Sequence, residues 1–583
     1  MQVKIDKYTI ELKEDMACSL KDVREKDGIT FYDFQFNWTT ENAENDDEFI
    51  VMWMDEVKGA MYKWDSSCKI RRNMMDDPWA DAFPSMISVN APVTCLFDGK
   101  DKNCYTWALS ECCKLMKIQN GIDDYETCMI PQFSFNVRQF TNQYETVITL
   151  YIDRRPIPMQ KSVADVVDWW ANDLGMTPMP VPPAAREPLY SFWYSHHQNV
   201  SEEIVEAECR RAKDLGFEIC IVDDGWHTDT TNGGYAYCGD WIPAKSKFPN
   251  MAEHVKRVHE IGMKYILWYS VPLIGYNSEH FKEFESMLLR DVPHLYAQLL
   301  DPRYKETRAF MVETYKKALT EWDLDGFKLD FIDTWTDIPA NAPYNERMDI
   351  PALQDAVNVC MNEIVSELIK IKPDILLEFR QGYVGPHMKQ FGNMFRVADC
   401  PGDYLKNRAS IFDLRMLMGD QAVHSDMLML APFDDPETNA LQIISCMFGT
   451  LQYSGKLSRI DDASRKMSRF WLSFLKEHRE LLQSKNLTTY EAHLLYTWAK
   501  ATEGNECAVG VYAIDKCVKP DAMDTIYIAN GCMGDRVFVE LDGKYAVQIL
   551  DCYGEEVESS VQELRGVNIL NVPMGGLIVL KKA

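Results

Sequence analysis

Short apolar runs alternate with amphipathic segments from about residue 189 to 484, and this alternation constrains the fold more than any other feature of the sequence. Runs such as "ICIV" and "YILWY" are typical of strands that are buried on both faces. The pattern predicts strands at residues 189–195, 217–226, 264–270, 325–333, 375–381, 394–400, 422–430 and 451–458. Apolar residues at helical spacing predict helices at 201–216, 251–262, 306–323, 351–371, 409–419, 436–448 and 462–484.

Regular alternation of strands and helices predicts a parallel sheet. Eight such units over about 300 residues are typical of a (β/α)8 barrel. The alternative is a doubly wound open sheet, which normally carries a glycine-rich phosphate-binding turn after its first strand. The segment after the first expected strand reads "HHQNV" and contains no such turn. The barrel is therefore the favoured interpretation.

The regions on either side of the expected barrel are rich in strand patterns. Stretches such as "ITFYDFQFNWTT" and "ETVITLYI" precede it, and "CAVGVYAI" and "TIYIAN" follow it. The proline-rich segment "MTPMPVPPAAREP" is typical of a domain boundary. We expect an N-terminal β domain with linker at 1–180, the barrel at 181–487 and a small antiparallel β domain at 488–583.

Charge and composition exclude several classes of partner. The net charge of −28 argues against nucleic acid and anionic membranes as partners. No signal peptide is visible, and no stretch approaches the roughly 20 apolar residues of a membrane span. The 17 cysteines are expected to be reduced thiols of a cytoplasmic protein. Because no CxxC pair occurs and the histidines lack ligand-like spacing, we expect neither a metal nor a cofactor.

The stretch "DGFKLDFID" (325–333) places charged residues in an otherwise apolar strand. Alternation puts Lys328 and Asp330 on one face and Phe327, Leu329 and Phe331 on the other. A structural ion pair inside the barrel would account for this pattern. A face directed into a functional site would account for it equally well.

Polar and aromatic residues recur where the expected strands end, and in a barrel those ends form the active site. They are Trp193, Asp223, Asp224, Trp226, Trp268, Lys328, Asp330, Asp333, Glu378, Arg380, Arg396, Asp399, His424 and Asp426. Singly, each has a structural explanation: Asp223 and Asp224 could cap a turn, and Trp268 could belong to the core. Together, carboxylates and indole rings at one rim suit a sugar, and paired carboxylates are the machinery of glycoside hydrolysis.

The motifs "VDDGWH", "GDWIPAKSKFPN", "GMKYILWYS" and "GFKLDFID", followed by "AVHSD" and "GTLQYSGKLS", resemble the successive barrel motifs of glycoside hydrolase family 36. These are the retaining α-galactosidases and their relatives. The resemblance runs from about residue 190 to 460. It implies an N-terminal β-sandwich, a catalytic (β/α)8 barrel and a C-terminal antiparallel β domain.

Carried over by position, the resemblance implies that Asp330 is the nucleophile and Asp399 the acid/base, with Asp403 as the competitor for the second role. The residues that it implies for substrate binding are Asp223 and Asp224 on the O4 and O6 side, Trp193 and Trp268 as wall and platform, and Lys328 as a hydroxyl contact. Their positions at strand ends add Trp226, Arg380 and Arg396 to the expected substrate-binding residues. Arg380 departs from the family, which commonly has a Cys–Gly motif there. It could bind a hydroxyl, acetamido or anionic group, or pair with Glu378 or another carboxylate.

The resemblance thus implies hydrolysis of terminal α-galactosides of small oligosaccharides by double displacement through a glycosyl-aspartate. Lys328 should favour the charged form of the nucleophile, whereas burial and the negative charge of Asp330 should raise the pKa of Asp399. The alternatives are an α-N-acetylgalactosaminidase, another retaining α-glycosidase or transglycosylase of the same clan, and a non-catalytic carbohydrate-binding relative. Many members of the family are oligomeric, so a homo-oligomer is among the partners considered.

Overall fold

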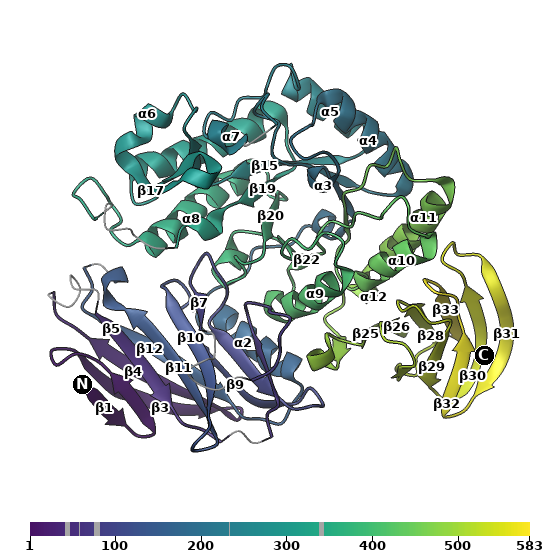
Figure 1. Ribbon diagram of the computed structural model, residues 1–583, viewed down its shortest axis with the longest axis horizontal. Helices are drawn as coiled ribbons and strands as arrows, with labels where there is room; N and C mark the ends of the chain where they lie inside the picture. Colours follow the sequence, from purple (N-terminus) through teal and green to yellow (C-terminus); the bar gives the residue numbers. More distant parts are fainter. Residues whose placement is uncertain (41–46, 57–58, 75–81, 141, 232–233, 337–342) are drawn as a thin grey trace.

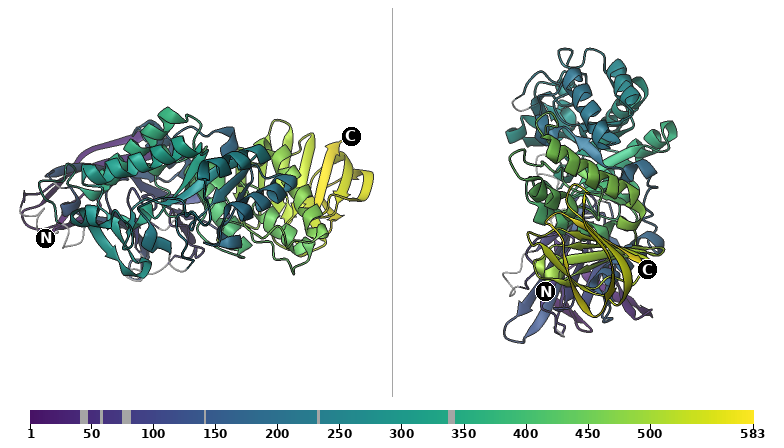
Figure 2. Two further views of the ribbon diagram at one scale, coloured as in Figure 1. Left: turned by 90° about the horizontal axis from the view of Figure 1, so that it is seen from above. Right: turned by 90° about the vertical axis from the view of Figure 1, so that its right-hand side faces the viewer.

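Three β-rich regions follow one another along the chain in the computed structural model (Figure 1). The structure describes residues 1–583 except 41–46, 57–58, 75–81, 141, 232–233 and 337–342. The N-terminal sheets lie below the helix-covered barrel in Figure 1, and the C-terminal sheets lie to its right. Seen from above in Figure 2, the molecule is elongated, with the N-terminal strands at one end and the C-terminal strands at the other.

Two six-stranded sheets form the N-terminal region. The first has the order β1 (Gln2–Ile5), β2 (Tyr8–Glu11), β5 (Glu48–Trp53), β11 (Cys128–Asn136), β10 (Met116–Asp123) and β7 (Phe83–Ser85). The second has the order β3 (Ala17–Lys26), β4 (Ile29–Asn37), β12 (Glu145–Asp153), β9 (Asn103–Leu109), β8 (Val93–Phe97) and β6 (Tyr62–Asp65). Trp53 of the first sheet and Trp107 of the second meet edge to face, with ring centroids 5.3 Å apart. The two sheets therefore share a core, as in a β-sandwich.

A helix that the sequence analysis did not predict, α2 (Met159–Asn172), follows the sandwich. It contacts β8, β9 and α9 (Tyr404–Met418), and so lies between the sandwich and the barrel. The Trp170 indole nitrogen donates to the backbone oxygen of Leu109 at 2.9 Å. The sequence interpretation used only the proline-rich segment beyond α2, as a domain boundary, and not the helical pattern before it.

The predicted barrel is confirmed. Its eight parallel strands have the order β22 (Ala422–His424), β21 (Met394–Arg396), β20 (Leu376–Arg380), β19 (Gly326–Asp330), β15 (Lys264–Ser270), β14 (Ile219–Val222), β13 (Leu189–Ser191) and β23 (Gln452–Tyr453). A parallel bridge between His424 and Thr450 brings the two edges together. Most strands are shorter than predicted, because the chain leaves the sheet as soon as it reaches the rim.

Helices cover the outside of the barrel in Figure 1. They are α4 (Glu202–Leu215), α5 (Met251–Ile261), α7 (Lys305–Trp322), α8 (Leu353–Ile371), α9, α10 (Pro436–Ser445), α11 (Asp462–Glu477) and α12 (Arg479–Leu482). As predicted, α4 begins after the N-cap Ser201 and ends at Gly216, whose φ of +110° suits glycine. Helix α9 begins well before residue 409, because the Asp403 carboxylate accepts a hydrogen bond from the Lys406 backbone N–H and caps it.

An insertion between β15 and α7 was not predicted. It contains α6 (Phe281–Phe284) and a three-stranded antiparallel sheet of β16 (Leu273–Gly275), β18 (Ala297–Leu300) and β17 (Leu288–Val292). These strands are short and pair with one another. For that reason they carry little of the periodicity that marks the barrel strands.

The C-terminal region consists of two sheets. The larger has the order β24 (Leu487–Tyr490), β25 (Trp498–Glu503), β26 (Glu506–Val511), β28 (Thr525–Asn530), β33 (Leu577–Lys582), β30 (Gly543–Leu550) and β31 (Glu556–Leu564). The smaller has the order β27 (Cys517–Val518), β29 (Arg536–Glu540) and β32 (Val567–Asn571). Pairing is mainly antiparallel, as predicted, with β26–β28 and β27–β29 as parallel pairs. Over the described part of the chain, no helix combines the length and apolarity that a membrane crossing requires.

Candidate active site

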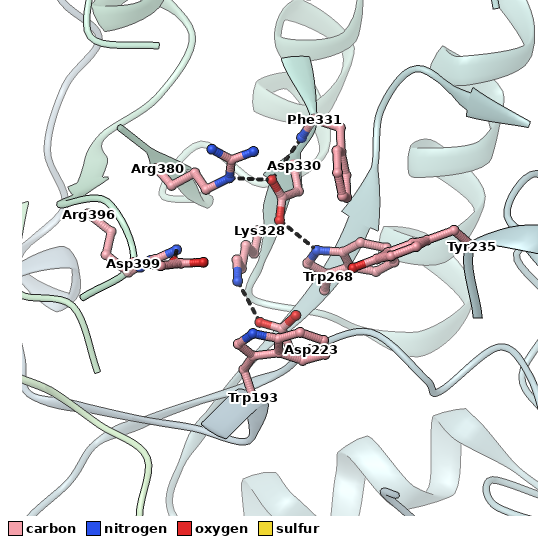
Figure 3. A pocket seen from close by; sticks show the side chains of 10 residues that line it. All are labelled: Trp193, Asp223, Tyr235, Trp268, Lys328, Asp330, Phe331, Arg380, Arg396 and Asp399. Carbon is pink, nitrogen blue, oxygen red and sulfur yellow. Dashed lines mark hydrogen bonds and ion pairs between the residues drawn. The ribbon is translucent and has the colours of Figure 1, made fainter. Parts of the chain in front are cut away.

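One cavity of about 270 Å³ opens at the carboxyl ends of the barrel strands (Figure 3). Its lining consists of Trp193, Asp223, Tyr235, Trp268, Lys328, Asp330, Phe331, Arg380, Arg396 and Asp399. Most of these residues lie at or within a few residues of the carboxyl end of a strand, so the barrel brings distant parts of the sequence to one rim. Eight of the ten are residues that the sequence analysis named as candidates for the site.

Strand β19 supplies the centre of the cavity. Lys328 and Asp330 point into it from the same face of the strand, as the alternation predicts. Phe331 also lines the cavity, and here the prediction is wrong. The strand ends at Asp330, and Phe331 has a φ of +64°, so the alternation of faces no longer applies and its ring turns toward the cavity.

The Asp330 carboxylate is held by four donors. Oδ1 accepts from Nε of Arg380 at 2.7 Å and from the backbone N–H of Phe331 at 2.8 Å. It also accepts from the Tyr383 hydroxyl at 3.2 Å. Oδ2 accepts from the Trp268 indole N–H at 3.1 Å. Together these contacts fix the orientation of the carboxyl group in the cavity, and Figure 3 shows those from Arg380, Phe331 and Trp268.

Asp330 is only 8% exposed, and burial by itself would favour its neutral form. The charges of Arg380 and Lys328, with the hydrogen bond from Trp268, outweigh burial and hold the pKa of Asp330 well below its usual range. The group is therefore a carboxylate at any pH near neutrality.

Lys328 binds Asp223 most closely. Its Nζ lies 2.6 Å from Oδ2 of Asp223. Burial opposes the charge of Lys328, but the carboxylate of Asp223 raises the pKa of the ammonium above its usual value. Lys328 thus acts on Asp330 through its charge, while its direct hydrogen bond orders Asp223 in the cavity wall.

Asp399 lies in the same cavity, just beyond β21. Nη2 of Arg396 donates to its Oδ1 at 2.8 Å, and the side chain is 55% exposed. Burial and the charge of Asp330 raise the pKa of Asp399, but Arg396 and Lys328 lower it more, so the net shift is downward. The expectation of a raised pKa is therefore wrong, because it left out the contact of Arg396 with this carboxylate.

The competitor Asp403 lies outside the cavity lining and caps α9. Arg396 itself is buried and also donates to Oδ1 of Asp426 at 2.5 Å. Asp426 in turn accepts from the Tyr194 hydroxyl at 3.0 Å and from the Cys400 backbone N–H at 2.7 Å. These contacts anchor the segment that carries Asp399.

Two predicted residues lie behind the cavity lining. Asp224 accepts a hydrogen bond from the Gln198 amide, and burial, together with the charge of Asp223, raises its pKa to about 7. Trp226 is fully buried and donates its indole N–H to the backbone oxygen of Trp268 at 2.9 Å. In this position Trp226 supports Trp268 rather than lining the cavity.

The sequence analysis missed two aromatic residues of the cavity, Phe331 and Tyr235. Tyr235 lies in a short 3₁₀ turn, Gly234–Tyr237, in the loop between β14 and α5. Its ring meets that of Phe331 edge to face at 5.3 Å. The sequence feature that could have indicated Tyr235 is its position after consecutive glycines in a loop that follows a barrel strand.

Outside the cavity, Glu202, Glu206 and His254 place possible metal-ligating atoms within 4.8 Å of one another. Arg257 ion-pairs with both glutamates, at 2.8 and 2.7 Å. An arginine between the two carboxylates already supplies the positive charge that a metal would bring, so this cluster is better explained as an ion-pair network.

Fold and cavity together define a (β/α)8-barrel protein with a carboxylate- and aromatic-lined site at the carboxyl ends of its strands. Residues 185–400 match the Melibiase family model. The predicted resemblance to the α-galactosidases of glycoside hydrolase family 36 is thereby confirmed.

Curated relatives support the same placement. The chain is 30% identical to an α-galactosidase of Lactobacillus acidophilus over 206 residues, which cover 33% of this chain and 27% of that protein. It is 24% identical to an α-galactosidase of Geobacillus stearothermophilus over 340 residues, which cover 55% of this chain and 44% of that protein. The matches thus span less than half of either relative.

Structural similarity extends over nearly the whole chain. The structure of a Geobacillus stearothermophilus family 36 α-galactosidase variant in complex with raffinose superposes with a TM-score of 0.64 at 14% identity. The superposition covers 99% of this chain and 81% of that one. At this identity the likeness concerns the fold, including the flanking β regions.

Proposed function

We propose that this protein is a retaining α-galactosidase that hydrolyses terminal α-galactosides of small oligosaccharides. The observation that carries the proposal is the presence of two carboxyl groups of different character in one cavity. Asp330 is buried and held ionised by Arg380 and Lys328, whereas Asp399 is half exposed at the rim. The relatives from Lactobacillus acidophilus and Geobacillus stearothermophilus are both named α-galactosidases.

In the proposed reaction Asp330 attacks the anomeric carbon while Asp399 protonates the departing oxygen. Water, deprotonated by Asp399, then releases the sugar from Asp330. Retention of configuration in this way requires the carboxyl groups to be about 5–5.5 Å apart, against about 6.5–9.5 Å for inversion. The cavity is small and bounded by Trp193 and Trp268, which suits a terminal sugar ring whose C–H face packs on an indole.

The acid must carry its proton when substrate is bound. The Asp399 side chain is 55% exposed, and contact with solvent water stabilises the charge of an exposed carboxylate. A bound sugar would displace that water and, with Asp330 nearby, favour the protonated form. We therefore propose that Asp399 is protonated in the complex with substrate and ionised in the free protein.

Two further features belong to the proposal. The relative whose structure contains raffinose suggests an oligosaccharide of that type as substrate. All 17 cysteines are free, which favours a reducing compartment such as the cytoplasm.

A panel of nitrophenyl α-glycosides, with the first-formed anomer followed by NMR, tests the proposal. We expect turnover of the α-galactoside above the α-N-acetylgalactosaminide and the α-glucoside, with α-galactose appearing before mutarotation. Initial β-galactose would contradict retention. Transfer to added acceptor sugars in preference to water would favour the transglycosylase alternative.

Replacement of the nucleophile gives the first specific prediction. Asp330→Ala should lose nearly all turnover, because no group remains to form the glycosyl-enzyme. Added azide should partly restore consumption of the nitrophenyl α-galactoside and yield β-galactosyl azide, identified by NMR, since azide would attack directly from the vacated side. An Asp330→Ala protein with full activity would contradict the assignment.

A further inference from the structure

The two oxygens of the Asp330 carboxylate have unequal surroundings. Oδ1 accepts from Arg380, from the Phe331 backbone N–H and from Tyr383. Within the described residues, Oδ2 accepts a hydrogen bond only from the Trp268 indole, and it lies on the side of the carboxylate nearer the open cavity (Figure 3). Oδ1 is therefore saturated, while Oδ2 keeps a lone pair available.

Arg380 donates to protein groups from all three of its guanidinium nitrogens. Its Nε binds Asp330, and Nη1 and Nη2 lie 3.2 Å from the two carboxylate oxygens of Asp333. Nη1 also donates to the backbone oxygen of Gln381 at 3.2 Å. The guanidinium lies over the rings of Phe331 and Tyr383, with its carbon 5.9 and 5.5 Å from their centroids. Each of its nitrogens thus has an acceptor before any substrate arrives.

We propose that Arg380 is a positioning residue that holds Oδ1 of Asp330 against Asp333, so that Oδ2 is the oxygen that attacks the anomeric carbon. This inference rests on the proposed glycosidase function and assigns a role within it. It replaces the expectation that Arg380 binds a substituent of the sugar.

Asp333 has a distinct part in this arrangement. When Oδ2 forms its bond to the anomeric carbon, the bond to the leaving oxygen breaks and that oxygen takes the proton of Asp399. Asp330 is then a neutral ester, and Arg380 would be left as a partly buried cation without its closest partner. Asp333 remains as its counter-ion. Water then attacks the anomeric carbon, gives a proton to Asp399 and breaks the bond to Oδ2, which restores the charge of Asp330.

The pH dependence of activity reports how strongly Arg380 acts on the Asp330 carboxylate. Activity is lost as pH falls through the pKa of the nucleophile, because only the carboxylate attacks. The charged and titratable groups that face Asp330 are Arg380, Lys328, Asp333, Asp399, Tyr235 and Tyr383. Burial raises the pKa of Asp330 and Arg380 is the largest influence that lowers it, so removal of Arg380 should bring the loss of activity to higher pH.

The experiment compares kcat/KM against pH for the full-length protein and three variants on nitrophenyl α-galactoside. Arg380→Met should move the acid limb to higher pH by about one unit or more. Arg380→Lys keeps the charge and should move it less. Asp333→Asn removes the ion pair between Arg380 and Asp333 but leaves the positive charge of Arg380 beside Asp330. The acid limb of this variant should therefore not move to higher pH.

The double variant Arg380→Met/Asp333→Asn removes both charges of the ion pair together. If the single Arg380→Met variant does not fold, the acid limb of kcat/KM is measured in this double variant instead. It too should show an acid limb at higher pH. A wild-type crystal structure with the glycosyl-enzyme trapped by a fluorinated α-galactosyl fluoride should show the sugar on the Asp330 oxygen that Arg380 does not contact.

Two results would overturn the inference. One is an unchanged acid limb in Arg380→Met or the double variant, with activity lowered only in amplitude, as a purely structural role predicts. The other is a trapped sugar on the oxygen that contacts Arg380. Both leave the proposed function intact, because the wild type is active in each. A wild type inactive on every α-galactoside would overturn the proposed function and this role of Arg380 together.

Discussion

Among single residues, Asp330 and Asp399 carry the same functional group, but their surroundings give the two carboxyl groups different properties. Asp330 ends a barrel strand and is surrounded by donors, whereas Asp399 follows a strand and keeps half of its side chain exposed. A buried, charge-stabilised carboxylate suits a nucleophile, and a group at the rim suits exchange of protons with the leaving oxygen and with water.

Removal of the acid/base should make activity depend on the leaving group. Asp399→Ala should lower kcat/KM on a trisaccharide such as raffinose by about 10²–10⁴-fold, because an alkoxide needs a proton to depart. Nitrophenyl α-galactoside should be affected far less, since nitrophenolate leaves unaided. Azide should accelerate its turnover and give α-galactosyl azide, because azide attacks the glycosyl-enzyme.

Asp403→Ala is the matched control. Asp403 caps α9 and lies outside the cavity lining, so its loss should reduce stability by about 0.5–2 kcal/mol and leave the ratio of the two substrates unchanged. If Asp403→Ala instead lost activity on raffinose far more than on nitrophenyl α-galactoside, and Asp399→Ala did not, the acid/base would be Asp403.

At the scale of elements, close approach of neighbouring strands holds the site together. Gly326 begins β19, and a Cβ atom added there would lie 1.9 Å from the backbone oxygen of Leu376 in β20. Glycine permits this approach because it has no side chain. β19 carries Asp330 and β20 carries Arg380, so the spacing of the two strands also sets the contact between those residues.

Gly326→Ala should therefore destabilise the protein by about 1–3 kcal/mol or more, through displacement of β19 from β20. Urea unfolding followed by circular dichroism measures the change. Gly99→Ala is the control, since its added Cβ would lie at an ordinary 3.7 Å from Sδ of Met61. Equal stability of the two variants would show that the barrel absorbs the extra atom without cost.

At the scale of the whole molecule, a single carboxylate joins the three β-rich regions. Asp413 of α9 accepts from the Trp64 indole at 3.0 Å and pairs with Arg72 at 2.5 Å, both from the N-terminal region. Its Oδ1 also accepts from the Tyr496 hydroxyl, from the C-terminal region, at 2.5 Å. All four side chains are buried, so the junction excludes water.

Asp413→Ala should leave Arg72 as a buried cation without this partner and cost about 3–5 kcal/mol. The midpoint of urea unfolding checks this value. Asp420→Ala, which removes an exposed ion pair with Lys485, should change stability by only about 0–1 kcal/mol. A cost for Asp413→Ala as small as that of the control would mean that this carboxylate contributes no more to stability than an exposed ion pair.

The order of strands and helices followed from the sequence, and so did most of the residues that line the cavity. Periodicity is local: buried parallel strands read as apolar runs, and helices show apolar residues at helical spacing. Polar residues such as Asp330 and Asp223 stand out because they interrupt runs that are otherwise apolar. Helix α2 and the small sheet inserted after β15 were missed, because neither fits the repeating unit.

Which charged side chains contact one another depends on the three-dimensional arrangement of the strands. Arg380 binds Asp330 and Asp333, and Lys328 binds Asp223, because of distances between different strands and the loops that follow them. The turn of Phe331 into the cavity depends on where β19 ends. Electrostatic interactions fall off over a few ångströms and change with burial, so a sequence that determines the strands still leaves the pairing of their charges open.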